Sequence, residues 1–327
     1  MPTVATLDVI AAKEWSFSLD ATYAINRASW SPNGQYVALA CYPDFVVILD
    51  GATGKEITRL EKLDYFQSHT LWADGGLRLA VQVSSSLKVF DCADWSVSSD
   101  IAFDAAWNTT PDVDKSGAWI ACGFRVVGSA PPATYTGFGN ITIRSIHNWP
   151  ESFDFNTKQE CGGVAWSPGD QLAHWDRFAY VTIWDVAKQS VLKAFSLPED
   201  RVACLTWHPS GETIVVGSRF DTNLYVYDVG STQLLHKLDL HPNGDLSASG
   251  INRAEFSHDG KWFLSKDTTL DSRVILWDTE TWHPVAQYES AGGGKRKRVP
   301  LAAIRPDGTL LLVPNDDCTG VVAWSFG

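Results

Sequence analysis

The amino-acid sequence predicts an all-β fold, and three observations lead to that prediction. No window longer than about ten residues keeps an amphipathic helical period without a glycine or a proline. Short apolar segments of strand length recur along the whole chain. Between them stands a repeated turn phrase, in which an aromatic or apolar residue is followed by two or three turn-forming residues and a glycine.

The turn phrase recurs at a regular interval. Its copies are Trp30 to Gly34, Trp72 to Gly75, Val113 to Gly117, Trp166 to Gly169, Trp207 to Gly211, Phe256 to Gly260 and Ile304 to Gly308. Successive glycines lie 41, 42, 52, 42, 49 and 48 residues apart. A period near forty is that of a propeller blade built from four short strands. Residues 1–327 are therefore predicted to form a single domain, a seven-bladed β-propeller of four-stranded blades.

A second phrase stands in register with the first, an alternating strand that often ends in an aromatic residue and aspartate. We predict that its copies are the third strands of the blades: Val46 to Asp50, Leu87 to Asp91, Ile141 to Arg144, Val181 to Asp185, Leu224 to Asp228, Val274 to Asp278 and Val321 to Ser325. Six are followed by a candidate outer strand: Lys55 to Leu60, Trp95 to Ile101, Ser152 to Asn156, Ser190 to Phe195, Gln233 to Leu238 and Pro284 to Glu289.

The seventh blade, Val299 to Phe326, has no outer strand of its own, and a strand-like segment, Trp15 to Leu19, precedes the first repeat. We expect this N-terminal strand to complete the last blade and to close the ring, which removes the exposed edges of an open array.

The dipeptides Trp184-Asp185 and Trp277-Asp278, together with the two periodic phrases, resemble the WD40-repeat β-propeller family over nearly the whole chain. The resemblance implies a rigid platform that binds a protein or peptide, a scaffold or adaptor in a larger complex. The family also has a buried hydrogen-bonded set that includes a Gly-His pair before the innermost strand. No repeat here has that pair, so we expect apolar packing of the fifteen tryptophans and other large side chains to hold the blades.

The charge composition of the chain excludes some classes of binding partner. With 26 basic and 38 acidic side chains the net charge is −12, which disfavours general binding of nucleic acid or anionic membranes. The chain shows neither a long apolar run nor a basic, apolar leader, so we expect a soluble, cytoplasmic protein. Six scattered cysteines without a CxxC pair are expected to be reduced thiols: Cys41, Cys92, Cys122, Cys161, Cys204 and Cys318.

In the predicted topology, the loops from second to third strand and from outer to next inner strand share one face around the channel. Loops on a rigid scaffold commonly carry binding residues. The candidate partner-binding residues are Arg201, Arg219, Arg298, Asp44, Trp175, Asp221, Tyr135 and Phe138. Three arginines at one mouth favour an acidic group on the partner. The alternative is that each residue belongs to an ordinary solvated turn.

The segment from Arg125 to Gly139 is predicted as a loop of unusual length with Pro131-Pro132 at its centre. It is interpreted as a lid or an anchor, or else as an insertion that packs on a neighbouring blade. With this lid, the channel mouth becomes the site of an alternative function, an enzyme or small-ligand binder. A closed pocket of a few hundred Å³ with convergent polar groups would favour that alternative over an open face.

No catalytic, metal or cofactor signature stands out. The histidines form no HxH or HExxH pair, and neither a GxSxG nor a phosphate-loop motif occurs. His208 and His258 are predicted in turns on the face opposite the loops, and His174 with Asp176 lacks further metal ligands. We therefore assign no catalytic residue, metal or cofactor.

One basic segment departs from the acidic average: Lys295, Arg296, Lys297 and Arg298 follow three glycines. We expect an exposed loop on the binding face. Three interpretations remain open: a solvated loop, an electrostatic contact for an acidic partner, and a basic cluster of the nuclear-import type.

Overall fold

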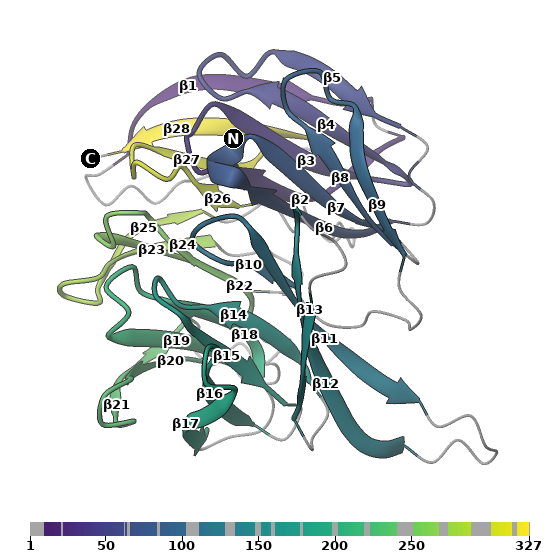
Figure 1. Ribbon diagram of the computed structural model, residues 1–327. Helices are drawn as coiled ribbons and strands as arrows, with labels where there is room; N and C mark the ends of the chain where they lie inside the picture. Colours follow the sequence, from purple (N-terminus) through teal and green to yellow (C-terminus); the bar gives the residue numbers. More distant parts are fainter. Residues whose placement is uncertain are drawn as a thin grey trace.

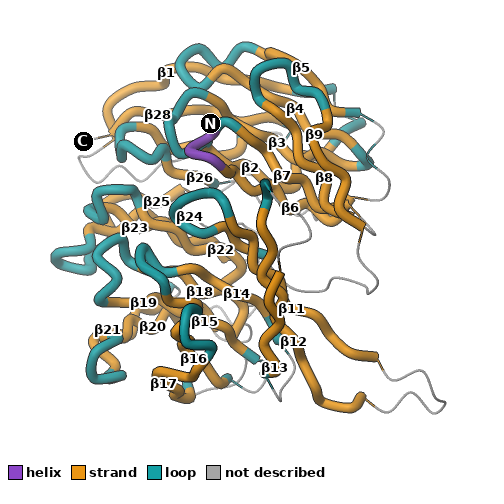
Figure 2. The backbone as a smooth tube through the Cα atoms, viewed as in Figure 1, coloured by secondary structure: helices purple, strands orange, loops and turns teal. Residues whose placement is uncertain are grey.

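The computed structural model describes residues 10–20, 22–61, 63, 66–83, 86–102, 111–127, 135–147, 152–157, 161–176, 179–197, 202–218, 223–240, 251–267, 274–288, 302–315 and 319–326. They form seven antiparallel sheets of four strands, arranged as the blades of a ring (Figure 1). The predicted all-β, seven-bladed propeller is confirmed. Apart from one short 3-10 turn, Asp74–Gly76, the described backbone consists of strands and loops (Figure 2). Among these residues, no helix has the length and apolar character needed to cross a membrane.

The blades follow one another along the chain, and each runs from an inner to an outer strand. Blade one comprises β2 (Ala24–Trp30), β3 (Tyr36–Tyr42), β4 (Phe45–Asp50) and β5 (Glu56–Leu60). Blade two comprises β6 (Phe66–Ala73), β7 (Arg78–Val83), β8 (Ser86–Asp91) and β9 (Val97–Ala102). Blade three comprises β10 (Asp112–Val113), β11 (Trp119–Val127), β12 (Tyr135–Ser145) and β13 (Ser152–Asn156).

The remaining blades repeat this order. Blade four comprises β14 (Gly163–Trp166), β15 (Gln171–Trp175), β16 (Tyr180–Asp185) and β17 (Ser190–Ser196). Blade five comprises β18 (Val202–Trp207), β19 (Thr213–Ser218), β20 (Asn223–Asp228) and β21 (Leu234–Asp239). Blade six comprises β22 (Ile251–Phe256), β23 (Trp262–Asp267), β24 (Val274–Asp278) and β25 (Pro284–Tyr288). Blade seven comprises β26 (Ala303–Ile304), β27 (Leu310–Pro314), β28 (Gly320–Phe326) and β1 (Ile10–Ser18).

The core lies between the blades. Described buried side chains form clusters that each join two consecutive blades, including blade seven to blade one. Second strands such as β3 and β19 are buried along almost their whole length, because both of their faces pack against other blades. Outer strands such as β17 are mostly exposed. Burial on both faces explains why the second strands are continuous apolar runs in the sequence.

The N-terminal strand closes the ring as predicted. Strand β1 pairs antiparallel with β28, from Ile10 opposite Phe326 to Ser18 opposite Gly320. It begins five residues before the predicted Trp15, and two register shifts interrupt the pairing. The Trp15 ring is 7% exposed and packs edge-on against Trp30 of blade one, with ring centroids 6.2 Å apart. The strand therefore joins blade seven to blade one through side chains as well as backbone.

The aspartate that ends several third strands has a local role. The carboxylate of Asp278 accepts hydrogen bonds from the backbone N–H and the hydroxyl of Thr281, at 2.8 and 2.9 Å. Asp50 makes the same contacts with Thr53, and Asp185 accepts from the N–H of Lys188. The Trp-Asp phrase thus marks the tight turn between third and outer strands, where aspartate fixes the backbone.

The segment 125–139 differs from the predicted long loop. Strands β11 and β12 continue through it, with Arg125 opposite Gly139 and Val127 opposite Tyr135, so residues 128–134 alone lie outside the described part. The alternating apolar residues at both ends of the segment explain the continued pairing. The two strands extend beyond the other blades as a long hairpin (Figure 1).

Candidate functional site

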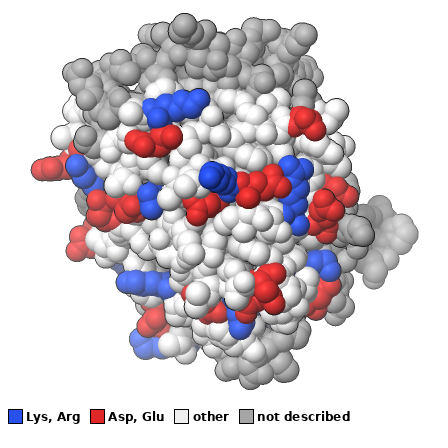
Figure 3. Space-filling view, turned by 90° about the horizontal axis from the view of Figure 1, so that it is seen from above, with Lys and Arg blue, Asp and Glu red and all other residues white. Residues whose placement is uncertain are grey.

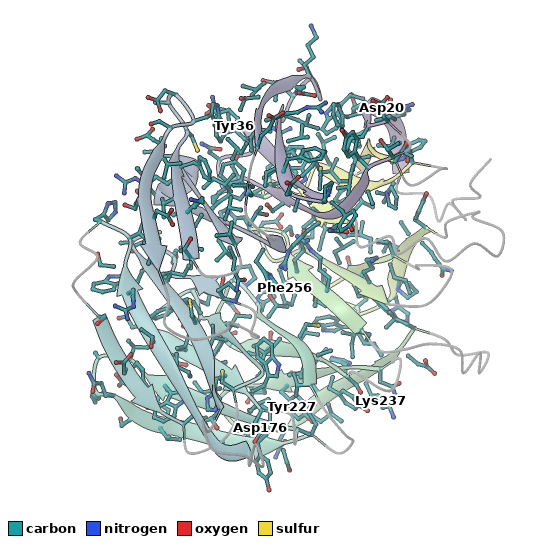
Figure 4. The ribbon with its side chains drawn as sticks, turned by 90° about the vertical axis from the view of Figure 1, so that its right-hand side faces the viewer. Asp20, Tyr36, Asp176, Tyr227, Lys237 and Phe256 are labelled. Carbon is teal, nitrogen blue, oxygen red and sulfur yellow. The ribbon has the colours of Figure 1, made fainter. Side chains whose placement is uncertain are left out.

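Charged side chains converge on the centre of the ring. The inner strands contribute Arg27 from β2, His69 from β6, Asp112 from β10, and Arg253 and Glu255 from β22. Phe256, at the end of β22, lies near the middle of the ring, whereas Lys237 of outer strand β21 lies at its edge (Figure 4). The five residues of the inner strands are called the central cluster below: Arg27, His69, Asp112, Arg253 and Glu255.

Two members of the central cluster form an unusual pair. Nη1 of Arg27 lies 2.6 Å from Nδ1 of His69. A guanidinium can only donate, so Nδ1 accepts and the imidazole is neutral, with its proton on Nε2. Burial, followed by the positive charges of Arg27 and Arg253, lowers the pKa of His69 to about 3. Burial and Arg253 likewise lower the pKa of Arg27 to about 9.

The two carboxylates of the central cluster bind backbone amides of the next blade. Glu255 accepts from Nε and Nη2 of Arg253 at 3.0 and 2.6 Å, and its other oxygen accepts from the N–H of Ile304 in blade seven. Asp112 accepts from the N–H of Trp166 in blade four at 2.7 Å. Burial raises the pKa of Asp112 to about 6, although the hydrogen bonds that its carboxylate accepts from the amides of Trp166 and Val113 act to lower the pKa.

Other inner strands are also bonded across blade boundaries. The Ser29 hydroxyl lies 2.9 Å from that of Thr70, and the indole N–H of Trp72 donates to Ser29 Oγ at 3.1 Å. In the same way, Trp207 Nε1 donates to the carbonyl of Ala165 at 3.0 Å. Polar contacts between neighbouring blades thus supplement the apolar packing that the sequence predicts. A site held in this way is rigid.

Charges elsewhere are distributed differently. On the rim seen from above Figure 1, basic and acidic side chains lie intermixed rather than gathered by sign (Figure 3). Outer strand β5 shows the pattern, since Arg59 and Glu56 pair at 2.6 Å while each stays about one third exposed. Such exposed pairs contribute little to stability or recognition. The central cluster differs because its side chains are less exposed, 12% for Arg253 and 23% for Glu255.

The central cluster is not among the predicted site residues, although the sequence carries a signal for it. When the inner strands are aligned on the first residue of the turn phrase, Arg27, His69 and Arg253 stand three positions before it. Asp112 and Glu255 stand one position before it. Positions one and three lie on the same side of a strand. Charges at these positions in separate repeats predict a cluster at the axis.

The structure places some of the predicted partner-binding residues. Asp44 is exposed in the turn between β3 and β4. Trp175 is 2% exposed and packs among the buried side chains between blades four and five, so its ring belongs to the core. Tyr135 and Phe138 lie in β12, with side chains outside the described part. The other predicted residues lie outside the described residues: Arg201, Arg219, Asp221, Lys295, Arg296, Lys297 and Arg298.

His174 has a structural partner. Its Nδ1 accepts a hydrogen bond from Nε1 of Trp184 at 2.8 Å, and its side chain is buried. In blade six the indole of Trp277 donates to Ser265 Oγ at 2.8 Å. His174 and Ser265 occupy corresponding positions in their second strands. Each lies two residues after the residue that pairs with the tryptophan, Leu172 in blade four and Phe263 in blade six. In both Trp-Asp repeats the indole N–H therefore donates a buried hydrogen bond to the second strand. The acceptor is a serine hydroxyl in blade six and a histidine nitrogen in blade four.

The His174 contact predicts a pH dependence. Burial lowers the pKa of His174 from 6.5 to about 4, so the folded protein binds fewer protons than the unfolded chain between these pH values. The stability that His174 contributes should be complete above pH 6.5, and about 3 kcal/mol should be lost as the pH falls to 4 and below. In His174→Ser, urea unfolding should show a smaller loss across this range. Equal slopes in the two proteins would contradict the prediction.

The opposite face is held by polar turns. His208 and His258 lie in turns after inner strands, as predicted, and His208 Nε2 lies 3.2 Å from the carbonyl of Gly260. His147 of blade three contacts Asp74 and Arg78 of blade two, at 2.9 Å from Nε2 and 3.2 Å from Nδ1. His208 and His147 therefore join adjacent blades through their side chains, and His258 does so through its backbone N–H, which donates to the carbonyl of Pro306.

The described cysteines are free thiols: Cys41, Cys92, Cys122, Cys161 and Cys204. Cys318 lies outside the described residues. Burial raises the pKa of Cys41, Cys92 and Cys204 to about 12, so their thiolates are disfavoured at neutral pH.

An apolar cavity of about 10 Å³ lies between blades six and seven, lined by side chains that include Leu276, Val313 and Trp324. That volume holds at most about one water molecule and is much smaller than the volume of a ligand pocket. Within the described part of the chain, no three His, Cys, Asp or Glu side chains are close enough to hold a metal ion.

Comparison with protein families places a match on blades four and five. Residues 189–228 match the family model described as WD domain, G-beta repeat. The match spans the outer strand of blade four, β17, and the first three strands of blade five.

Proposed function

Because the seven-bladed ring and the matched repeat make this chain a WD40-repeat propeller, we propose that it is a rigid platform that binds a protein or peptide. The carrying observation is the closed ring, in which each blade is packed and bonded to its neighbours. A closed ring holds the ends of its strands at fixed positions, so the points from which a partner-binding face is built do not move. Fixed attachment points lower the entropy cost of binding.

The turn between β3 and β4 supports a binding role for the predicted loop face. Tyr42 is 61% exposed and stands beside exposed Asp44. The next residue, Phe45, is buried against Tyr23 with ring centroids 5.0 Å apart, and the backbone carbonyl of Asp44 accepts from the N–H of Leu63. The turn is therefore anchored from below while an aromatic ring and a carboxylate face solvent, a combination typical of interaction surfaces.

Arginine replacement on the loop face tests the platform. We expect Arg201→Ala, Arg219→Ala and Arg298→Ala together to abolish capture of the partner by the purified chain, with little change in the melting curve. The physical reason is the loss of bidentate hydrogen bonds to an acidic group. Captured proteins would be identified by mass spectrometry.

A matched control is available on the opposite face. Lys55, Lys115 and Lys188 are exposed in turns of blades one, three and four. Their replacement by alanine removes the same charge and should leave capture unchanged. Equal capture by the arginine variant and the wild type would place the binding surface elsewhere.

The basic segment gives a kinetic prediction. Replacing Lys295, Arg296 and Lys297 by serine should slow association with an acidic partner and flatten its salt dependence, without changing stability. Salt screens exposed charges beyond about 8 Å at physiological ionic strength, so the difference should be largest at low salt. Association rates over a salt series measure this effect. An unchanged rate at low salt would leave the solvated and nuclear-import interpretations.

A further inference from the structure

We propose that the central cluster is a binding site for an oxyanion, a carboxylate or phosphate group, held between Arg27 and Arg253 with His69 beside them. The proposal concerns the centre of the ring and not the loops. It therefore stands or falls separately from the platform role.

The first observation is the shortage of acceptors for two arginines. Glu255 takes Nε and Nη2 of Arg253, and Nη1 is buried with no acceptor among the described residues. The hydrogen-bond partner of Arg27 there is the neutral imidazole of His69. A guanidinium withdrawn from water ordinarily pairs with a carboxylate. The central cluster thus has donors that an added oxyanion would satisfy.

The second observation is that the local carboxylates are already engaged. Glu255 bonds to Arg253 and to the Ile304 amide, while Asp112 bonds to the amides of Trp166 and Val113. These bonds tie Glu255 to blade seven and Asp112 to blade four, so neither can move to bond directly to Arg27 without breaking contacts between blades. A diffusible anion or an acidic side chain from outside is therefore the fitting partner.

The third observation is the set of donors and their access to solvent. The neutral His69 carries its proton on Nε2, which adds a donor beside two guanidinium groups. The side chains of Arg253 and Glu255 keep 12% and 23% of their surface exposed, so the cluster is in contact with solvent. Planar guanidinium groups suit the oxygens of carboxylate and phosphate. Partial desolvation strengthens such contacts relative to the exposed pairs on the rim.

Titration of the full-length protein with inorganic phosphate tests the proposal, with chloride replaced so that ionic strength stays constant. We expect a saturable rise in the melting temperature and matching heat in calorimetry. Arg27→Gln should weaken phosphate binding about tenfold or more, the effect of one charge-assisted hydrogen bond. This variant removes the repulsion from Arg253 together with the attraction of Glu255 and Asp112, and its melting curve without phosphate checks that it folds. Arg59→Gln, on outer strand β5, is the matched control and should bind like the wild type.

A second measurement does not depend on any variant. Phosphate should shift the ring resonances of His69 in the wild-type protein, whereas those of exposed His283 should stay in place. A short peptide with glutamate side chains separates the sources of the anion: competition with phosphate indicates an acidic group of a partner, and its absence indicates a free anion. No saturable phosphate effect at constant ionic strength, or equal binding by Arg27→Gln and the wild type, would overturn the proposal.

Discussion

A protein that lacks residues 1–20 is expected to lose cooperative unfolding and to populate a partly open ring at temperatures where the full chain is folded. The deletion removes β1, which contributes the whole outer strand of blade seven and the buried Trp15. It also exposes the edge of β28, which invites association with other chains. Calorimetry and light scattering of the purified protein measure both effects. A truncated protein that melts at the full-length temperature would refute this role.

A point substitution separates the side chain from the backbone of β1. Trp15→Ala should destabilise the protein by about 3–5 kcal/mol, the usual cost of removing a buried large aromatic side chain. Trp15 lies against Gly54, where a Cβ would approach the indole to 2.3 Å, so the space is filled from both sides. Lys13→Ala, on an exposed position of the same strand, should change stability by no more than about 0.5 kcal/mol. Similar losses in both variants would show that packing of the indole contributes little.

The second large effect is expected at Glu255. In Glu255→Gln the amide keeps the size of the side chain but leaves the charge of Arg253 without its counter-ion in a partly desolvated place. Breaking such a pair by removing one partner typically costs about 3 kcal/mol or more. Chemical denaturation of the two proteins measures the difference.

The exposed pair on β5 supplies the control for Glu255. Glu56→Gln breaks a contact with Arg59 of the same 2.6 Å length. Its cost should be no more than about 1 kcal/mol because water solvates both groups. The double variant Arg253→Met with Glu255→Gln should recover much of the loss, since it removes both charges and keeps an acceptor for the Ile304 amide. A small loss in Glu255→Gln, equal to that of the control, would mean that solvent already screens the central pair.

The ring could be predicted from the sequence because its repeats depend on local physics. The turn phrase and the terminal aspartates each fix a hairpin by contacts within a few residues, as at Asp278 and Thr281. The turn phrase recurs in all seven blades and the terminal aspartate in five of them, so both leave a period that can be read directly. The hairpin that continues into residues 125–139 was missed because prolines and glycines at its centre suggested a loop for the whole segment.

The central cluster depends on contacts between residues far apart in the sequence. Arg27 and His69 are 42 positions apart, and Glu255 reaches Ile304 across 49 positions. Each is unremarkable in its own strand, and the group becomes visible when the inner strands are placed around a common axis. The histidine at position 174 illustrates the same limit, because its role depends on Trp184 across the strand pair.

The pairing of β1 with β28 also has a consequence for the time course of biosynthesis. Ile10 emerges from the ribosome long before Phe326, its partner in the sheet. Throughout that interval the apolar side of this first strand has no place to pack, while blades one to six can assemble from neighbouring segments. Closing the ring therefore has to bring together two strands of very high sequence separation, a contact that forms slowly. Until it forms, the edge of β28 stays unpaired and the apolar side of β1 stays exposed, and both favour association with other chains.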